Sequence, residues 1–317
     1  MKQSRTVYVP SGVSSFFEIC DRNPGGDLID DPLKIGARGG GFIIEKGTTT
    51  VAFCPIESQT DQIYIDGKKT AEARTSLEVI RLIRKKFKIP PVRISHVIQA
   101  PIGQGFGTSG AGALTTSLAI SDLFDLKFSL AKAAEFAHIS EINNLTGLGT
   151  VISLASGTGA IGLVTEPGTY SVGRTDAILS DPDDYTLVCA TFGPTKKSTV
   201  LTDERARSLI NEFGRNTLDK IIDDPTPERL LAESRVFSEK TKLASTELLK
   251  LSDKAVKSGA LGATPNMIGN AIHCLVAKKD YSKFSENFSK LIPKETLFES
   301  ELIQSGPRIS SSDRHNV

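Results

Sequence analysis

Hydrophobic and polar positions along the chain follow strand periodicity in some segments and helical periodicity in others. Residues 5–10, 41–54 and 92–100 are rich in β-branched side chains of alternating polarity, which predicts strands. Residues 75–87 carry their apolar side chains at helical spacing, and residues 108–125 are a run of small and apolar residues that predicts a buried helix. The first half of the chain therefore interleaves strands with helices.

The second half of the chain is richer in helices. Turn residues at 180–184 mark a boundary, and residues 203–257 have a mainly helical pattern, whereas residues 271–277 predict a buried strand. Because the helices gather late, the pattern favours an α+β fold in two lobes over a doubly wound sheet. We expect an N-terminal, nucleotide-binding domain over residues 1–178 and a C-terminal domain over residues 179–317.

A glycine-rich segment joins the predicted strand 92–100 to the predicted helix 108–125. Glycines allow a phosphate to approach the backbone closely, and the N–H groups and dipole at a helix N-terminus attract an anion. We therefore interpret this segment as a loop that binds the phosphates of a nucleotide. The residues expected at the nucleotide are Pro101, Gly103, Gly105, Gly107, Thr108, Ser109, Gly110 and Ala111.

Other interpretations of this loop fit the sequence less well. A dinucleotide fingerprint places an acidic residue at the end of a second strand, but Asp125 ends a predicted helix. A P-loop requires a lysine that residues 92–125 lack, and a nucleophile elbow requires glycine where Ala111 stands. A tight turn that only packs the helix stays open, as does a second glycine-rich segment at 36–41, which is either a site loop or a linker.

Composition narrows the classes of protein. Lysine and arginine number 38 against 37 aspartates and glutamates, a formal net charge of +1, so we expect no nucleic-acid partner. The four cysteines are widely spaced and form no Cys-x-x-Cys pair, which is typical of reduced thiols in a cytoplasmic protein. No apolar run of about eighteen residues and no signal-peptide pattern occur, so we expect no membrane association.

With the loop motif in view, the chain resembles the GHMP kinase superfamily, whose second motif has the form Pro-x-Gly-x-Gly-x-Gly-Ser-Ser-Ala. Residues 101–111 match that motif closely. Further segments are similar to the archaeal pantoate kinase branch of the superfamily. These are residues 10–19, 31–41, 141–149 and 166–168, with residues 267–270 similar to its third motif.

The resemblance implies a two-lobed, α+β, GHMP-kinase-like fold with the phosphate loop in the N-terminal lobe and a helix-rich C-terminal lobe. It also implies transfer of the γ-phosphoryl group of ATP, with Mg²⁺, to the primary hydroxyl of the pantoyl group in coenzyme A biosynthesis. Ser109 would contact phosphate and metal, Glu141 would be the carboxylate ligand of Mg²⁺, and Thr150 would stand at the catalytic position. The substrate-binding residues implied are Ser14, Phe16, Arg38, Gly39, Gly147 and Gly149. Related kinases suggest a homodimer by analogy.

The chain departs from the branch at two places. The branch usually has aspartate after Gly-Leu-Gly, where this chain has Thr150, and threonine cannot take up a proton at neutral pH. The branch also usually carries an arginine on the strand before the Pro-Gly turn, and residues 157–165 contain none. An active kinase with a rebuilt acceptor site fits these changes, because a loose transition state places little demand on a base. A nucleotide-binding regulator without activity is a lesser alternative.

The missing arginine bears on the identity of the acceptor. Pantoate carries a carboxylate close to its reacting hydroxyl, whereas pantothenate carries an amide there. A neutral lining suits the amide better than an unpaired carboxylate, so we expect pantothenate slightly ahead of pantoate. Lys34, Arg38 and Arg174 are the cations that could replace the missing arginine, whereas His138 and His273 are interpreted as core histidines.

Overall fold

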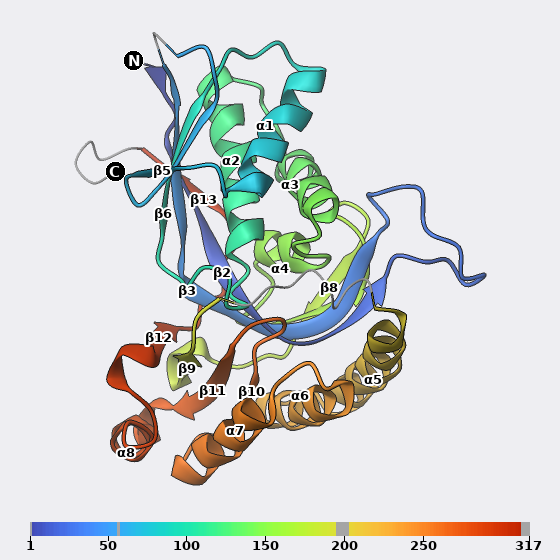
Figure 1. The fold of residues 1–317 in the computed structure, drawn as a ribbon, viewed down its shortest axis with the longest axis vertical. Coiled ribbons are helices and arrows are strands. Elements are labelled where there is room, and N and C mark those ends of the chain that lie inside the picture. Colours follow the sequence, from blue (N-terminus) through green and yellow to red (C-terminus); the bar gives the residue numbers. More distant parts are fainter. Residues whose placement is uncertain (1, 56–57, 195–202, 312–317) are drawn as a thin grey trace.

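The computed structural model describes residues 2–55, 58–194 and 203–311, and two sheets organise this part of the chain (Figure 1). Within it, the larger sheet has nine strands in the order β13-β2-β3-β6-β4-β5, with β1 and β7 also on β3 and with β8 on β7. Its strands are β1 (Lys2–Gln3), β2 (Thr6–Cys20), β3 (Gly36–Cys54), β4 (Gln62–Ile65), β5 (Lys68–Thr70), β6 (Arg93–Ile98), β7 (Ile161–Glu166), β8 (Arg174–Ala177) and β13 (Arg308–Ser310).

Four helices cover one face of this sheet (Figure 1). They are α1 (Arg74–Lys86), α2 (Thr108–Phe124), α3 (Leu130–Asn144) and α4 (Thr150–Ser156). Helix α2 is buried on nearly all sides because small residues such as Ala111, Ala113 and Ala119 let the sheet and the neighbouring helices approach it closely. The helix that carries the predicted phosphate loop is thus fixed in the core.

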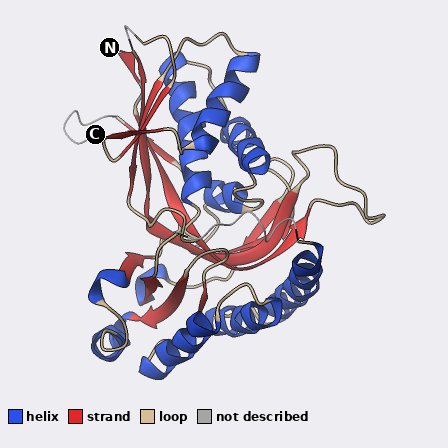
Figure 2. Cartoon of the chain, in the orientation of Figure 1, coloured by secondary structure: helices blue, strands red, loops and turns tan. Residues whose placement is uncertain are grey.

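The smaller sheet lies below the first and is covered by helices on its outer side (Figure 2). Its order is β10-β11-β9-β12. The strands are β9 (Tyr185–Thr191), β10 (Gly262–Pro265), β11 (Ala271–Ala277) and β12 (Leu297–Glu301). The helices are α5 (Glu204–Asp223), α6 (Pro227–Thr241), α7 (Thr246–Ser258) and α8 (Tyr281–Phe288), and short 3₁₀ turns cover Pro182–Asp184, Lys278–Asp280 and Lys294–Thr296.

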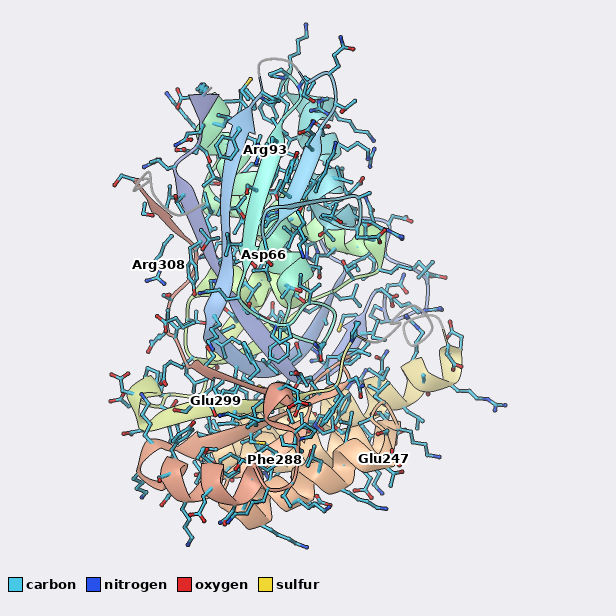
Figure 3. All side chains as sticks on the ribbon, turned by 60° about the vertical axis from the view of Figure 1, so that its left-hand side comes forward. Asp66, Arg93, Glu247, Phe288, Glu299 and Arg308 are labelled. Carbon is cyan, nitrogen blue, oxygen red and sulfur yellow. The ribbon has the colours of Figure 1, made fainter. Side chains whose placement is uncertain are left out.

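Figure 3 labels Arg308 on the last strand of the larger sheet, and Glu299 and Phe288 in the second lobe. The Arg308 guanidinium lies 4.6 Å from the centre of the Tyr8 ring, where β13 pairs with β2. In the second lobe, the Tyr281 hydroxyl of α8 donates to Glu299 of β12 at 2.7 Å, and within α8 the Phe288 ring stacks on that of Phe284 at 5.0 Å. The last strand of the chain therefore returns to the larger sheet.

The two-lobed α+β architecture predicted from the sequence is confirmed, as are the strand before the phosphate loop and the helix after it. Among the described residues, no helix has both the length and the apolar character required to cross a bilayer. We propose residue 178 as the boundary between the lobes, with β13 crossing back to the first.

The interpretation of residues 36–41 as a loop or linker was wrong, because these residues open strand β3. A Cβ at Gly39 would lie 2.5 Å from the Phe16 carbonyl oxygen, and one at Gly41 would lie 2.0 Å from the Val13 carbonyl oxygen. The glycines therefore let β3 lie unusually close to β2, where the pairing shifts register between Ser14 and Phe16.

Candidate active site

A cavity of about 790 Å³ opens between the phosphate loop, strands β2 and β3, and the start of α4. This volume is in the range of sites that bind small molecules and cofactors. Most of the predicted site residues line it. Those residues are Ser14, Phe16, Arg38, Gly39, Gly103, Gly105, Gly107, Thr108, Ser109, Gly147, Gly149 and Thr150. The structure thus brings together residues from four separate segments of the sequence, whereas Pro101, Gly110, Ala111 and Glu141 are not part of the lining itself.

The phosphate loop has the geometry of an anion site. Gly103, Gly105 and Gly107 have φ values of +76°, +84° and +64°, which side chains other than glycine rarely adopt. Helix α2 starts directly after Gly107, and no side chain caps it within the described structure. The first N–H bonded inside the helix is that of Ala111, which donates to the Gly107 carbonyl at 3.0 Å. The preceding N–H groups are therefore available to phosphate oxygens.

Ser109 and Glu141 meet at the mouth of this loop. The Ser109 hydroxyl donates to Glu141 Oε1 at 2.7 Å, and the Thr146 hydroxyl donates to the same oxygen at 3.0 Å. Glu141 is 1% exposed, so α3 holds its carboxylate against the first turn of α2. Hydroxyl and carboxylate oxygens are the ligands that a hard divalent cation prefers. Within the described residues, three or more histidine, cysteine or acidic side chains nowhere gather into a metal site, so such a cation would need phosphate oxygens as well.

Thr150 is the first residue of α4, a helix that the sequence did not predict. Its side chain fills the space beside two glycines. A Cβ at Gly107 would lie 2.9 Å from Thr150 Cγ2, and one at Gly147 would lie 2.8 Å from Thr150 Oγ1. Gly110 is equally confined, because a Cβ there would lie 2.8 Å from Glu141 Oε2. Thr150 therefore presents a neutral hydroxyl close to the phosphate loop.

Arg38 supplies a cation at the opposite wall of the cavity. Its Nε donates to Glu18 Oε2 at 2.7 Å, and its Nη2 also pairs with that carboxylate. Arg215 of α5 donates from Nη2 to the other oxygen of Glu18 at 3.0 Å. The three side chains together carry one net positive charge, since two arginines share one carboxylate. Arg38 lines the cavity, with its side chain 27% exposed.

The other candidate cations lie elsewhere. The Arg174 side chain is 72% exposed and pairs with Glu166 at 3.4 Å, and that of Lys34 is 65% exposed and pairs with Asp31 at 3.9 Å. Neither lines the cavity. His138 is buried, its Nε2 lies 2.9 Å from the Ile35 carbonyl oxygen, and burial lowers its pKa. The interpretation of His138 as a core histidine is thus supported by its surroundings.

Comparison with known proteins agrees with this geometry. Residues 74–157 match the GHMP kinases N terminal domain. The chain is 29% identical over 294 residues to a pantoate kinase of Thermococcus kodakarensis, which covers 90% of this chain and 92% of the relative. It is 26% identical to a pantoate kinase of Methanocaldococcus jannaschii, over 86% of this chain and 93% of the relative. A solved structure described as a phosphotransferase related to the CoA biosynthesis pathway superimposes with a TM-score of 0.82, at 26% identity over 96% of this chain and 98% of that one.

Residues 74–157 form a GHMP kinase N-terminal domain, and the chain is similar over nine-tenths of its length to pantoate kinases, which resemble the GHMP kinase superfamily. It is a phosphotransferase with an alcohol acceptor, and kinases of this superfamily use ATP. The resemblance that the sequence motifs indicated is therefore confirmed. The interpretations of the glycine-rich loop as a dinucleotide fingerprint, a P-loop or a nucleophile elbow are therefore not supported.

Sequence reasoning missed the contribution of the second lobe to this GHMP kinase site. Met267 and Ile268 line the cavity, and the Asn266 side chain donates from Nδ2 to the Gln104 carbonyl of the phosphate loop at 3.1 Å. The similarity of residues 267–270 to the third motif of the family was the signal that pointed there. It gave no indication that Asn266, one position earlier, holds the loop.

Proposed function

We propose that this protein is an ATP-dependent pantoate kinase, which transfers the γ-phosphoryl group to the primary hydroxyl of pantoate. The observation that carries the proposal is a single cavity with an anion-binding loop and the Ser109–Glu141 pair on one side and Arg38 on the other. The relatives that span nine-tenths of the chain are named pantoate kinases, which supports the same acceptor.

The expected preference for pantothenate is not supported, because those relatives bear the name of the alternative acceptor. Its physical premise was the absence of an arginine on the strand before the Pro-Gly turn, which is β7. In the sheet, β7 pairs with β3 so that Val164 lies opposite Gly39, next to Arg38. A cation on β3 therefore stands beside β7, the strand on which the family usually carries its arginine. Arg38 pairs with Glu18 through Nε and Nη2 and lines the cavity, where its guanidinium would pair with the pantoate carboxylate.

The residues present fit ATP and a magnesium ion. The N–H groups of Thr108, Ser109 and Gly110 would hold phosphate oxygens. The Ser109 hydroxyl and the Glu141 carboxylate would hold Mg²⁺, which when bound neutralises charge on the phosphates. In the transfer, the pantoate hydroxyl oxygen bonds to the γ-phosphorus as the bond to the bridging oxygen breaks and ADP leaves. Thr150 takes no proton, so the hydroxyl proton passes to a phosphoryl oxygen and then to water.

A coupled assay of ADP release tests the proposal, with ATP and Mg²⁺ and with pantoate or pantothenate as acceptor. We expect kcat/KM for pantoate to exceed that for pantothenate at least about tenfold, because an unused cation beside an amide contributes little. A preference for pantothenate of the same size would contradict the choice of acceptor. Binding of ATP without turnover of either alcohol would instead favour the regulator alternative. The homodimer stays a prediction, which sedimentation velocity would test.

A further inference from the structure

A buried histidine in the second lobe connects two walls of the active-site cavity. His273 lies on β11 and is 0% exposed. Its Nε2 lies 2.8 Å from the Ser15 hydroxyl of β2, and its Nδ1 lies 2.8 Å from Asn266 Oδ1. Asn266 Nδ2 in turn reaches the Gln104 carbonyl oxygen at 3.1 Å. Three hydrogen bonds therefore run from strand β2 through the second lobe to the phosphate loop.

The hydrogen bond between Asn266 and Gln104 determines which group donates in each hydrogen bond of this series. A carbonyl oxygen only accepts, so Asn266 donates from Nδ2 to Gln104 and turns Oδ1 toward the imidazole. His273 then carries its proton on Nδ1 and donates to Asn266, which leaves Nε2 to accept from the Ser15 hydroxyl. A neutral imidazole with one defined tautomer meets both requirements, and full burial lowers the His273 pKa to about 3.

Both ends of this series of hydrogen bonds lie beside residues that we predict to contact the substrates. Ser15 lies at the register shift between Ser14 and Phe16, two residues that line the cavity, and such a shift turns an extra side chain out of the regular pairing. At the other end, Gln104 lies between Gly103 and Gly105 of the phosphate loop. The acceptor wall and the nucleotide loop are thus tied to the same imidazole.

Backbone contacts beside the chain keep the same parts together. The Met267 N–H donates to the Ser14 carbonyl at 2.9 Å. Gly269 passes so close to the loop that a Cβ there would lie 2.2 Å from the Gln104 carbonyl oxygen. Close packing alone fixes distance, whereas the side-chain hydrogen bonds fix the orientation of the Gln104 peptide and hence of the N–H groups that follow it.

We propose that His273 and Asn266 are positioning residues for phosphoryl transfer, which set the phosphate loop relative to the acceptor wall. They act through Gln104 and Ser15 and do not touch substrate. This inference rests on the proposed kinase activity and not on the choice of pantoate. Positioning of the two reactants is the main contribution of a protein to phosphoryl transfer, so a small displacement of the loop lowers the rate.

Two substitutions of His273 distinguish the effect of its hydrogen bond to Ser15 from the effect of its hydrogen bond to Asn266. In His273→Asn, the side-chain amide nitrogen would stand where Nδ1 stands, so this variant retains the link to Asn266 and loses the link to Ser15. His273→Gln reaches further and retains the link to Ser15 while losing the link to Asn266. We expect His273→Gln to weaken binding of a non-hydrolysable ATP analogue about tenfold in calorimetry, and His273→Asn to raise the acceptor KM with little change in nucleotide binding.

Cys274→Ala is the matched control, because Cys274 is the next residue of β11, is equally buried, and packs in a hydrophobic cluster with Phe284 and Phe288 of α8. It should lower the unfolding midpoint without changing either KM. If the His273 variants do not fold, Ser15→Ala is a milder substitution for the same test. It should raise only the acceptor KM.

The proposal is overturned if the folded variants of His273 or Ser15 leave nucleotide binding and both KM values unchanged. It is also overturned if Cys274→Ala changes nucleotide binding and the KM values as much as the His273 variants do, at the same loss of stability. If the unsubstituted enzyme phosphorylates neither pantoate nor pantothenate, the proposed function fails, and the calorimetric comparison still decides whether His273 positions the loop.

Discussion

Replacing Arg38 by glutamine removes the cation that we propose for the pantoate carboxylate. Arg38 lines the cavity with its side chain 27% exposed, while its Nε and Nη2 pair with Glu18. A hydrogen bond between charged groups contributes about 1.5–3 kcal/mol. Since about 1.4 kcal/mol corresponds to tenfold, Arg38→Gln should lower kcat/KM for pantoate about 10-fold to 150-fold. The loss should appear mainly in the pantoate KM, because the carboxylate is bound in both the ground and the transition state.

The effect on stability has to be separated from the effect on binding. The Glu18 side chain is 5% exposed, and breaking one pair to a buried carboxylate destabilises a protein. Arg215 still donates to Glu18 after the substitution, at 3.0 Å and 3.3 Å. Arg215→Gln is therefore the matched control, because it removes the other partner of Glu18 and lies outside the cavity lining.

Steady-state ADP release with varied pantoate, together with denaturant titrations, measures both effects. We expect Arg38→Lys to recover part of the lost kcat/KM, and Arg215→Gln to retain nearly all of it at a comparable loss of stability. A wild-type pantoate KM in Arg38→Gln would refute the assignment of the carboxylate to Arg38. An equal rise in KM in Arg215→Gln would show that the whole cluster acts indirectly.

The geometry of the loop and the core leads to three other predictions. Gly110→Ala should lower kcat at least about tenfold, because its Cβ would lie 2.8 Å from Glu141 Oε2, whereas Gly112→Ala, with an ordinary 3.7 Å contact, should retain activity in the same assay. Ser109→Ala should lower kcat about 100-fold or more and weaken the dependence on Mg²⁺, measured by metal titration, since it removes the hydroxyl beside Glu141 that we propose as a ligand of Mg²⁺. Burial lowers the His96 pKa from 6.5 to about 4, so its neutral form supports the fold above about pH 6.5 and about 3 kcal/mol is lost as the pH falls to about 4. Urea titrations at pH 7 and 4.5 measure that loss, and His96→Gln should reduce the difference between them.

Local patterns were sufficient to predict the segment that carries the phosphates. The alternation before residue 99 gave β6, and the glycines with the small-residue run gave the loop and α2, because each depends on neighbours in sequence. The proximity of Ser109 and Glu141, which are 32 positions apart, came from the family motifs and not from periodicity. Periodicity identifies which face of α3 is buried without identifying its partner.

The glycines at 36–41 show where local reasoning stops. Glycine repeats are typical of loops, and nothing in these residues indicates a strand. Their strand conformation depends on the Phe16 and Val13 carbonyls of β2, which come so close that a side chain at Gly39 or Gly41 would clash. A partner about 25 positions earlier in the chain therefore decides the structure of this segment.

The acceptor site shows why a missing motif residue is weak ground for a changed substrate. The sequence lacks an arginine on β7, and that absence alone favoured an uncharged group beside the reacting hydroxyl. In the sheet, however, β7 lies against β3, and the pairing of Val164 with Gly39 brings Arg38 close to β7 although the two segments are more than a hundred residues apart. A substrate carboxylate responds to the charge at a point in the cavity and not to the strand that supplies it. We therefore propose that Arg38, which shares Glu18 with Arg215, supplies the positive charge for the pantoate carboxylate from a different strand.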